Sequence, residues 1–344
     1  MVGAKIDVHA HFVPPCWREA LLANGLDQPD GMPEIPAWDL STHVQLMDSM
    51  GIQKSYLSIT SPGVHLVAGK DALAKQLARE CNEFAYSIKR EMPDRFGSFA
   101  SLPLPDLEGS IKELDYVCDY LKADGVVLHT NYHGKYLGDN YFQPIFKELN
   151  RRGVVVFIHP TSPCTMTTPG CAHLKGGPLP QYPVPVFEFM FETCRCVIDL
   201  FLSGAISRYP NIRYILPHAG GALPPLIQRF SEAATLIPNL SLDTSVTPEG
   251  VRAMLNNRFW FDTAGPTFPE QIKSLLHYVR PDRICYGTDY PFTPFQGVQH
   301  LGRIMEENLA TMLDSQEERD GIYGNNALRL LKKKLSLDNT GTST

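Results

Sequence analysis

The sequence lacks any long uninterrupted stretch of hydrophobic side chains. No apolar run approaches the roughly 20 residues that a helix needs to cross a bilayer, although 43% of the 344 residues are hydrophobic. The first residues, Met1-Val2-Gly3-Ala4-Lys5, contain no apolar core of a secretory signal. We therefore expect a soluble cytoplasmic protein with no membrane partner.

Positive charge is scarce and scattered. The chain has 31 Lys and Arg residues against 37 Asp and Glu residues, which gives a net charge of −6. Its longest basic run is Lys332-Lys333-Lys334. Because proteins bind nucleic-acid phosphates through clustered positive charge, we expect no nucleic-acid partner.

The cysteines lack the spacing of a disulfide framework. Eight cysteines are spread over the chain, and Cys194 and Cys196 are too close together for ordinary bridging. There is also no internal repeat and no linker between domains. We therefore predict one domain over residues 1–334 and a flexible tail over residues 335–344.

Short β-branched or aromatic runs alternate with amphipathic stretches along the whole chain, which predicts repeated βα units around a parallel sheet. The predicted strands are Lys5–His9, Lys54–Thr60, Phe96–Leu102, Gly125–His129, Val154–His159, Ile212–His218, Phe259–Thr263 and Ile284–Thr288. The predicted helices are Ser41–Met50, Gly69–Met92, Asp106–Leu121, Tyr141–Asn150, Pro185–Arg208, Ala222–Ala234, Pro269–Tyr278 and a pair after Gln299. Eight such strands predict an α/β fold, a single (β/α)8 TIM barrel.

Two stretches interrupt this alternation. Phe12–Trp38 follows the first strand, Pro160–Tyr182 follows the fifth, and both are rich in Pro, Gly and Cys. We predict insertions here. Because loops after the strands build the reactive face of such a barrel, they are candidate walls of a substrate pocket.

Polar residues stand where four of the predicted strands end. His9 and His11 are two positions apart on an extended segment, so their side chains leave the same face. His159 closes the fifth strand, His218 closes the sixth, and Asp289 follows the eighth. Barrel enzymes place catalytic groups at these strand ends, which predicts that the five residues meet at one site.

Imidazole nitrogens with one carboxylate oxygen form a ligand set that favours Zn²⁺, with Mn²⁺ as the alternative. His129 ends the fourth strand and is interpreted as a further ligand, a substrate contact or a structural histidine. No lysine stands there to become a carboxylated bridge between two metals, so we predict one divalent ion per chain. His218 is well placed as a general acid or base.

The motifs Asp7-Val8-His9-Ala10-His11, His159-Pro160, Pro217-His218-Ala219-Gly220-Gly221 and Gly287-Thr288-Asp289-Tyr290-Pro291-Phe292 are similar to those of the amidohydrolase-superfamily decarboxylases. This group includes the aminocarboxymuconate semialdehyde decarboxylases and the fungal 6-methylsalicylate decarboxylases. The resemblance runs from about residue 4 to about residue 332. It implies a TIM barrel, one divalent metal and non-oxidative loss of CO2.

The resemblance also implies roles for single residues. It makes His9, His11, His159 and Asp289 the metal ligands, His218 an active-site histidine and Phe292 a substrate contact. It aligns Arg229 with an arginine that reaches the substrate of a neighbouring subunit, which implies a homodimer.

Within this group the sequence favours an aromatic substrate. Gly25–Asp39 lacks the second substrate-binding arginine of the muconate enzymes, whereas Ser58–His65 resembles the salicylate branch. Phe187, Phe189 and Phe292 suit a flat ring, and His65 and His129 are further candidates for substrate contact.

The expected reaction is therefore decarboxylation of a 2-hydroxybenzoic acid such as 6-methylsalicylate, to 3-methylphenol and CO2. His218 or Asp289 would donate the proton. The alternatives are an aminocarboxymuconate semialdehyde decarboxylase and a metal-dependent hydrolase of a cyclic ester or amide.

Overall fold

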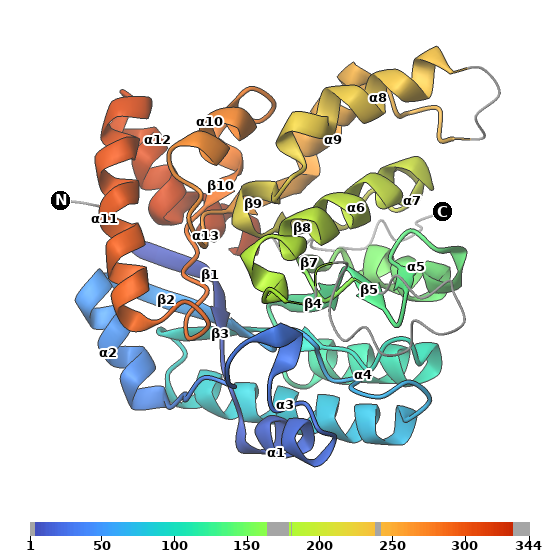
Figure 1. Ribbon diagram of the computed structural model, residues 1–344, viewed down its shortest axis with the longest axis vertical. Coiled ribbons are helices and arrows are strands. Elements are labelled where there is room, and N and C mark those ends of the chain that lie inside the picture. Colours follow the sequence, from blue (N-terminus) through green and yellow to red (C-terminus); the bar gives the residue numbers. More distant parts are fainter. Residues whose placement is uncertain (1–3, 164–178, 180, 238–241, 333–344) are drawn as a thin grey trace, which may run out of the picture.

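The computed structural model describes residues 4–163, 179, 181–237 and 242–332. Eight parallel strands form one sheet, with helices outside the strands on every side (Figure 1). Their order around the sheet is β1 (Lys5–His11), β2 (Ile52–Ser58), β3 (Phe96–Ser101), β4 (Gly125–His129), β7 (Val155–His159), β8 (Arg213–Leu216), β9 (Phe259–Asp262) and β10 (Ile284–Cys285). The eight predicted strands are thus all present, in their predicted order.

The two edges of this sheet come together and make it a barrel. The Val8 N–H donates to the Tyr286 carbonyl at 3.0 Å, and the His11 N–H donates to the Tyr290 carbonyl at 2.7 Å. Beside them the buried carboxylate of Asp7 accepts a hydrogen bond from the Thr288 hydroxyl at 2.7 Å. The predicted (β/α)8 TIM barrel is therefore confirmed.

Strand β7 is hydrophobic along most of its length because both of its faces are buried. Val155, Val156, Phe157 and Ile158 in β7 are all at most 2% exposed. Such continuous apolar runs are typical of parallel strands with helices on one face and a core on the other. The barrel interior is filled by a separate cluster of large side chains, which includes Val8, Tyr56, Phe99, Phe157 and Ile215.

Helices follow the strands and enclose the barrel. They are α1 (Pro15–Ala23), α2 (Leu40–Met50), α3 (Asp71–Glu91), α4 (Leu107–Asp119), α5 (Gln143–Arg152), α6 (Glu188–Leu202), α7 (Ala205–Arg208), α8 (Ile227–Leu236), α9 (Pro248–Arg258), α10 (Glu270–Leu276), α11 (Phe295–Met312), α12 (Gln316–Asp320) and α13 (Asn326–Lys332). A hairpin of β5 (Asn131–Tyr132) and β6 (Lys135–Tyr136) follows β4. None of the described helices is long and apolar enough to span a membrane.

Three helical details differ from the prediction. The helix predicted over Pro185–Arg208 is divided into α6 and α7, because Gly204 adopts a left-handed backbone with φ of 75°. Helix α1 occupies part of the first predicted insertion, and α9 was not predicted. Both begin with a proline at the first helical turn, where the missing N–H costs nothing.

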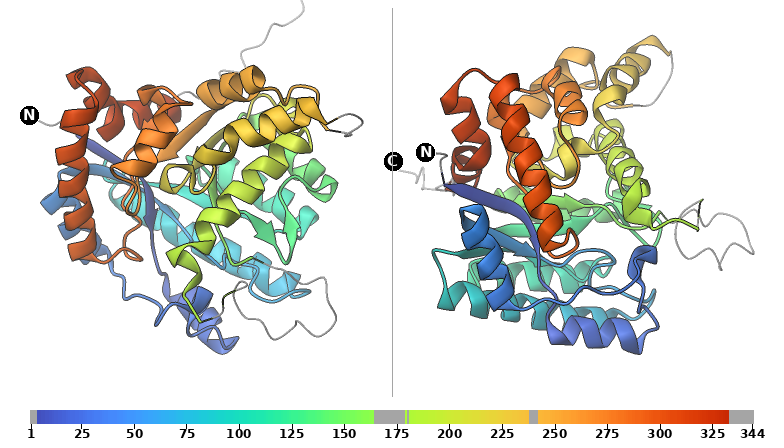
Figure 2. Two further views of the ribbon diagram at one scale, coloured as in Figure 1. Left: turned by 45° about the horizontal axis from the view of Figure 1, so that its top comes forward. Right: turned by 60° about the vertical axis from the view of Figure 1, so that its left-hand side comes forward.

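The first insertion contacts the segment that precedes α6. The first contains α1 and a short 3-10 helix, η1 (Pro29–Gly31), and η1 contacts a second 3-10 helix, η3 (Val184–Val186), which precedes α6. Most of the second insertion, and the predicted tail over 335–344, lie outside the described residues. Both views of Figure 2 show the helices packed around the strands.

Phe157 offers a test of the barrel interior. Its ring is fully buried and contacts the rings of Phe99 and His9, with centroids 5.8 and 4.9 Å away. We expect Phe157→Ala to lower the free energy of unfolding by about 3–5 kcal/mol, because it leaves a cavity that the barrel cannot close. Chemical denaturation would measure this loss. The matched control is Phe191→Ala on α6, where the side chain is 49% exposed and the change should be small.

Candidate metal centre and cavity

Four predicted residues converge where the strands end. His9 and His11 belong to β1, His159 ends β7, and Asp289 follows β10. One ligand atom from each of the four lies within 4.8 Å of the other three. His9 Nε2 and His11 Nε2 are 3.1 Å apart, and Asp289 Oδ1 lies 3.3 and 3.1 Å from them.

The other ring nitrogen of each histidine is already engaged. Nδ1 of His9 lies 2.8 Å from Asp262 Oδ2, and Nδ1 of His159 lies 2.7 Å from the Pro160 carbonyl. Nδ1 of His11 lies 3.1 Å from the Ser58 carbonyl. Carbonyl and carboxylate oxygens only accept, so the Nδ1 atoms carry the hydrogens. Each neutral ring then presents a lone pair at Nε2, as metal-binding histidines do.

The surroundings set the charges of these groups. Burial lowers the pKa of His11 and holds the pKa of His159 well below its usual value, so both rings are neutral. Burial opposes ionisation of Asp289, but the neighbouring His9 and a hydrogen bond with His11 hold its pKa well below the ordinary range. Three imidazole nitrogens and a carboxylate this close need a positive charge among them, which a proton or a metal ion can supply. The donor set therefore fits one divalent ion.

His9 differs from the other two rings. Burial lowers the pKa of His9, but Asp262 and Asp289 outweigh this effect and raise it to about 10. A metal ion has to displace the extra proton from this ring, since a ligand nitrogen must be unprotonated. Metal binding is therefore expected to weaken as pH falls.

Asp262 holds two parts of the site together, and the sequence analysis missed it. It ends β9 and is fully buried. Oδ2 accepts from the His9 ring, and Oδ1 accepts from the backbone N–H of His218 at 2.9 Å and of Ala264 at 3.0 Å. A carboxylate at the end of the apolar segment Phe259-Trp260-Phe261 was the signal that could have found it.

His218 lies beside the metal site on a strained turn. His218 and Ala219 have φ values of 54° and 51°, and Asp289 has a φ of 61°. Non-glycine residues rarely adopt this left-handed region, and such strain clusters at active sites. The Gln271 amide supports the turn through hydrogen bonds to the carbonyls of His218 and Gly221. His218 Nε2 is 3.8 Å from Asp289 Oδ2, close enough to act on a molecule bound at the ion.

A cavity opens above these residues. It is lined by Pro29, Asp30, Met32, Thr60, Ser61, His159, Pro185, Phe189, His218, Asp289 and Phe292. The Phe292 ring packs edge-on against His11, with centroids 5.6 Å apart. Pro29 to Met32 come from the first insertion, and Pro185 comes from the segment before α6. The cavity is thus lined by both polar and apolar side chains, the latter including Phe189 and Phe292.

The structure does not bring every predicted substrate contact to this cavity. Phe292 and Phe189 line it, whereas Phe187 does not. Both ring nitrogens of His65 are engaged, Nδ1 with His133 at 2.8 Å and Nε2 with Asp71 at 2.9 Å. No nitrogen of that ring is left for a substrate.

His129 and Arg229 are also outside the cavity lining. His129 is buried behind His159, with ring centroids 5.9 Å apart, and burial lowers its pKa to about 4. Arg229 is exposed on α8, which projects at the upper right of Figure 1.

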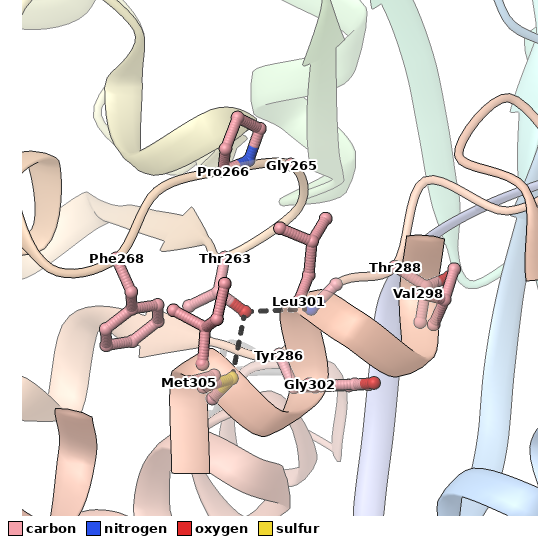
Figure 3. A pocket seen from close by; sticks show the side chains of 12 residues that line it. Thr263, Gly265, Pro266, Phe268, Tyr286, Thr288, Val298, Leu301, Gly302 and Met305 are labelled. Atoms are coloured by element: carbon pink, nitrogen blue, oxygen red, sulfur yellow. Dashed lines mark hydrogen bonds between the residues drawn. The ribbon is translucent and has the colours of Figure 1, made fainter. Parts of the chain in front are cut away.

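A second pocket lies behind Asp289, between α11 and the ends of β9 and β10 (Figure 3). Its lining contains no Asp, Glu, His, Lys or Arg. Thr263 Oγ1 accepts from the Gly287 N–H at 3.3 Å and lies 3.8 Å from Met305 Sδ. This contact fastens α11 to the strand end that carries Asp289, which indicates a supporting role rather than a catalytic one.

Comparison with known proteins agrees with this geometry. The family model described as Amidohydrolase matches residues 6–333. The chain is 40% identical over 308 residues to a 6-methylsalicylic acid decarboxylase of Penicillium expansum, covering 88% of this chain and 90% of that protein. It is 38% identical to a 6-methylsalicylic acid decarboxylase of Aspergillus aculeatus, covering 90% and 91%.

A solved structure shares the fold. This is 5-carboxyvanillate decarboxylase from Novosphingobium aromaticivorans in complex with manganese and 4-hydroxy-3-methoxy-5-nitrobenzoic acid. It superimposes with a TM-score of 0.80 at 23% identity, covering 96% of both chains. The chain therefore belongs to the amidohydrolase family and, within it, to the decarboxylases, so that it is an enzyme of the carboxy-lyase class.

Proposed function

We propose that this enzyme is a metal-dependent, non-oxidative decarboxylase of a 2-hydroxybenzoic acid, and that 6-methylsalicylate is its substrate. The observation that carries the proposal is the cation site of His9, His11, His159 and Asp289 at the floor of a cavity with aromatic walls. The fungal relatives that share 38–40% identity over most of the chain are named for this reaction.

His9, His11, His159 and Asp289 are proposed to hold one divalent ion. The nitrogen-rich set suits Zn²⁺, whereas solved structures of related decarboxylases contain manganese, so both ions are candidates. When bound, such an ion supplies positive charge that holds the substrate carboxylate and ortho-hydroxyl oxygen and withdraws electron density from the breaking bond.

The protein residues are proposed to orient the ring and supply the proton. Phe189 and Phe292 pack against a flat substrate. His218 donates a proton to the ring carbon that bears the carboxylate. The carbon–carbon bond then breaks, CO2 leaves, and the bonding electrons restore the aromatic ring. Asp289 is the alternative proton donor.

The direct test is incubation of the purified holoenzyme with 6-methylsalicylate. We expect CO2 and 3-methylphenol in equal amounts. Recovery of the intact acid would contradict the proposal, and CO2 release from an aminocarboxymuconate semialdehyde instead would identify the alternative decarboxylase.

Two neighbouring histidines give a matched test of the metal site. His129 and His159 are paired across β4 and β7, but only His159 belongs to the cation site. We expect His159→Ala to lose most of its bound metal and activity, because it removes one of four ligands. His129→Ala should keep its metal. Elemental analysis would measure metal content and identify the ion, and equal metal loss in both variants would refute the assignment.

His218 is tested by separating turnover from metal binding. Because general acid catalysis contributes roughly 10²-fold or more, we expect His218→Ala to lower kcat by about that factor while metal content stays unchanged. His277→Ala, at an exposed histidine that follows α10, is the control. A kcat within twofold of the wild type would exclude His218 as the proton donor.

We further propose a homodimer in which Arg229 serves the partner's site. Arg229 is exposed and does not line the cavity of its own chain, so it can contact substrate only in a second chain. Arg229→Ala should raise KM by about 10-fold, the loss expected for a charged hydrogen bond, whereas Arg303→Ala on the exposed face of α11 should not. Sedimentation equilibrium would show the dimer, and a fully active monomer would contradict this arrangement.

A further inference from the structure

Two carboxylates line the cavity, and only one belongs to the cation site. Asp289 lies with the three histidines, whereas Asp30 lies in η1, in the insertion that follows β1. Asp30 adopts a left-handed backbone with φ of 54°, and its side chain is only partly exposed. This carboxylate therefore has a fixed place in the wall of the cavity.

Hydroxyl groups hold Asp30 in that place. The Ser162 hydroxyl donates to Asp30 Oδ1 at 2.5 Å. Burial raises the pKa of Asp30 above its ordinary value, although hydrogen bonds with Ser162 and Ser61 act in the opposite direction. The Ser61 and Thr161 hydroxyls are in turn 2.7 Å apart. Hydroxyls that donate to a carboxyl group favour its ionised form.

No positive charge compensates Asp30 in the part of the chain that the structure describes. The described residues that line the cavity include neither Lys nor Arg. None of the ion pairs among the described residues includes Asp30, and the only cation site found among them uses Asp289 instead. In its ionised form, Asp30 therefore gives this wall of the cavity a negative charge that no described Lys or Arg residue neutralises.

We propose that Asp30 is a specificity-determining residue that excludes aromatic acids carrying a second negative group and restricts the enzyme to monocarboxylates. This inference rests on the proposed function and names the substrate class more narrowly. Like charges that face one another in a poorly solvated cavity repel strongly, and such repulsion is an effective means of rejecting a competing ligand. A neutral methyl or hydroxyl substituent meets no such penalty.

The hydrogen bond between Ser162 and Asp30 also joins the two insertions. The alternative is therefore that Asp30 has only a structural role. Ser162→Ala removes this hydrogen bond and keeps the carboxylate of Asp30. Asp30→Asn removes the charge and keeps an oxygen that can accept from Ser162. Asp27→Asn, at an exposed position of the same segment that does not line the cavity, controls for the loss of one charge.

The test compares kcat/KM for 6-methylsalicylate with kcat/KM for 4-hydroxyisophthalate and 2-hydroxyterephthalate, which carry a second carboxylate. The wild type should prefer the monoacid by about 10-fold or more, as expected for one unfavourable charge pair. Asp30→Asn should reduce this preference at least several-fold, whereas Ser162→Ala and Asp27→Asn should retain it. An unchanged preference in Asp30→Asn would overturn the inference.

Binding to the wild-type holoenzyme provides a test that needs no variant. Benzoate and terephthalate lack the ortho-hydroxyl group that the proposed reaction uses, and calorimetry can compare their affinities. Benzoate should bind about 10-fold more tightly, and equal affinities would overturn the role of Asp30. If no hydroxybenzoic acid releases CO2 but benzoate is still preferred, the proposed function fails while the inference about Asp30 stands.

Discussion

The site depends on one constraint, which is that the fold holds polar groups that repel one another close together. Ligand atoms of three imidazoles and one carboxylate meet within 4.8 Å, an arrangement that needs positive charge from a metal ion or from the extra proton on His9. Each ring is held by a fixed acceptor at Nδ1, so no ring can turn away without breaking a buried hydrogen bond. The affinity for an ion is thus built into the packing of the strands around it.

The barrel provides the rigidity that this arrangement needs. Asp262 connects His9 with the backbone of His218, so the ligand site and the proposed proton donor are positioned by one carboxylate. Left-handed backbone at His218 and Asp289 costs energy, and Gln271 and the hydrogen bonds between β1 and the segment after β10 hold it in place. The positions and the strained backbone of His218 and Asp289 are therefore maintained by Asp262 and Gln271, which do not line the cavity.

Much of this could be predicted from the sequence, because the strong signals were local. Apolar runs that end in His159, His218 or Asp289 identify both the strands and the end of the barrel at which the site lies. Helix α1 was missed because its prolines and cysteine are also typical of loops. The place of His65 could not be predicted, because its partners His133 and Asp71 meet it only through the fold.

The same dependence on tertiary contacts explains why the residues in the cavity walls were harder to predict than the metal ligands at its floor. Ligands at strand ends are positioned by the barrel itself. The position of Asp30, by contrast, depends on a hydrogen bond with Ser162, which is 132 residues further along the chain. Asp262 had a local signal, but it was overlooked because one carboxylate at the end of a strand resembles many polar residues that end strands.

The ligands also come from the first strand of the barrel and from the segment after its last strand. His9 and His11 lie in the first strand, and Asp289 follows the last one, next to which the seam of the barrel closes. A ribosome has to translate all eight strands of the barrel before Asp289 exists, so His9 and His11 cannot share an ion with Asp289 before that point. Completion of the metal site is therefore a late event in the synthesis of the barrel, and it depends on the metals available in the compartment where the barrel folds.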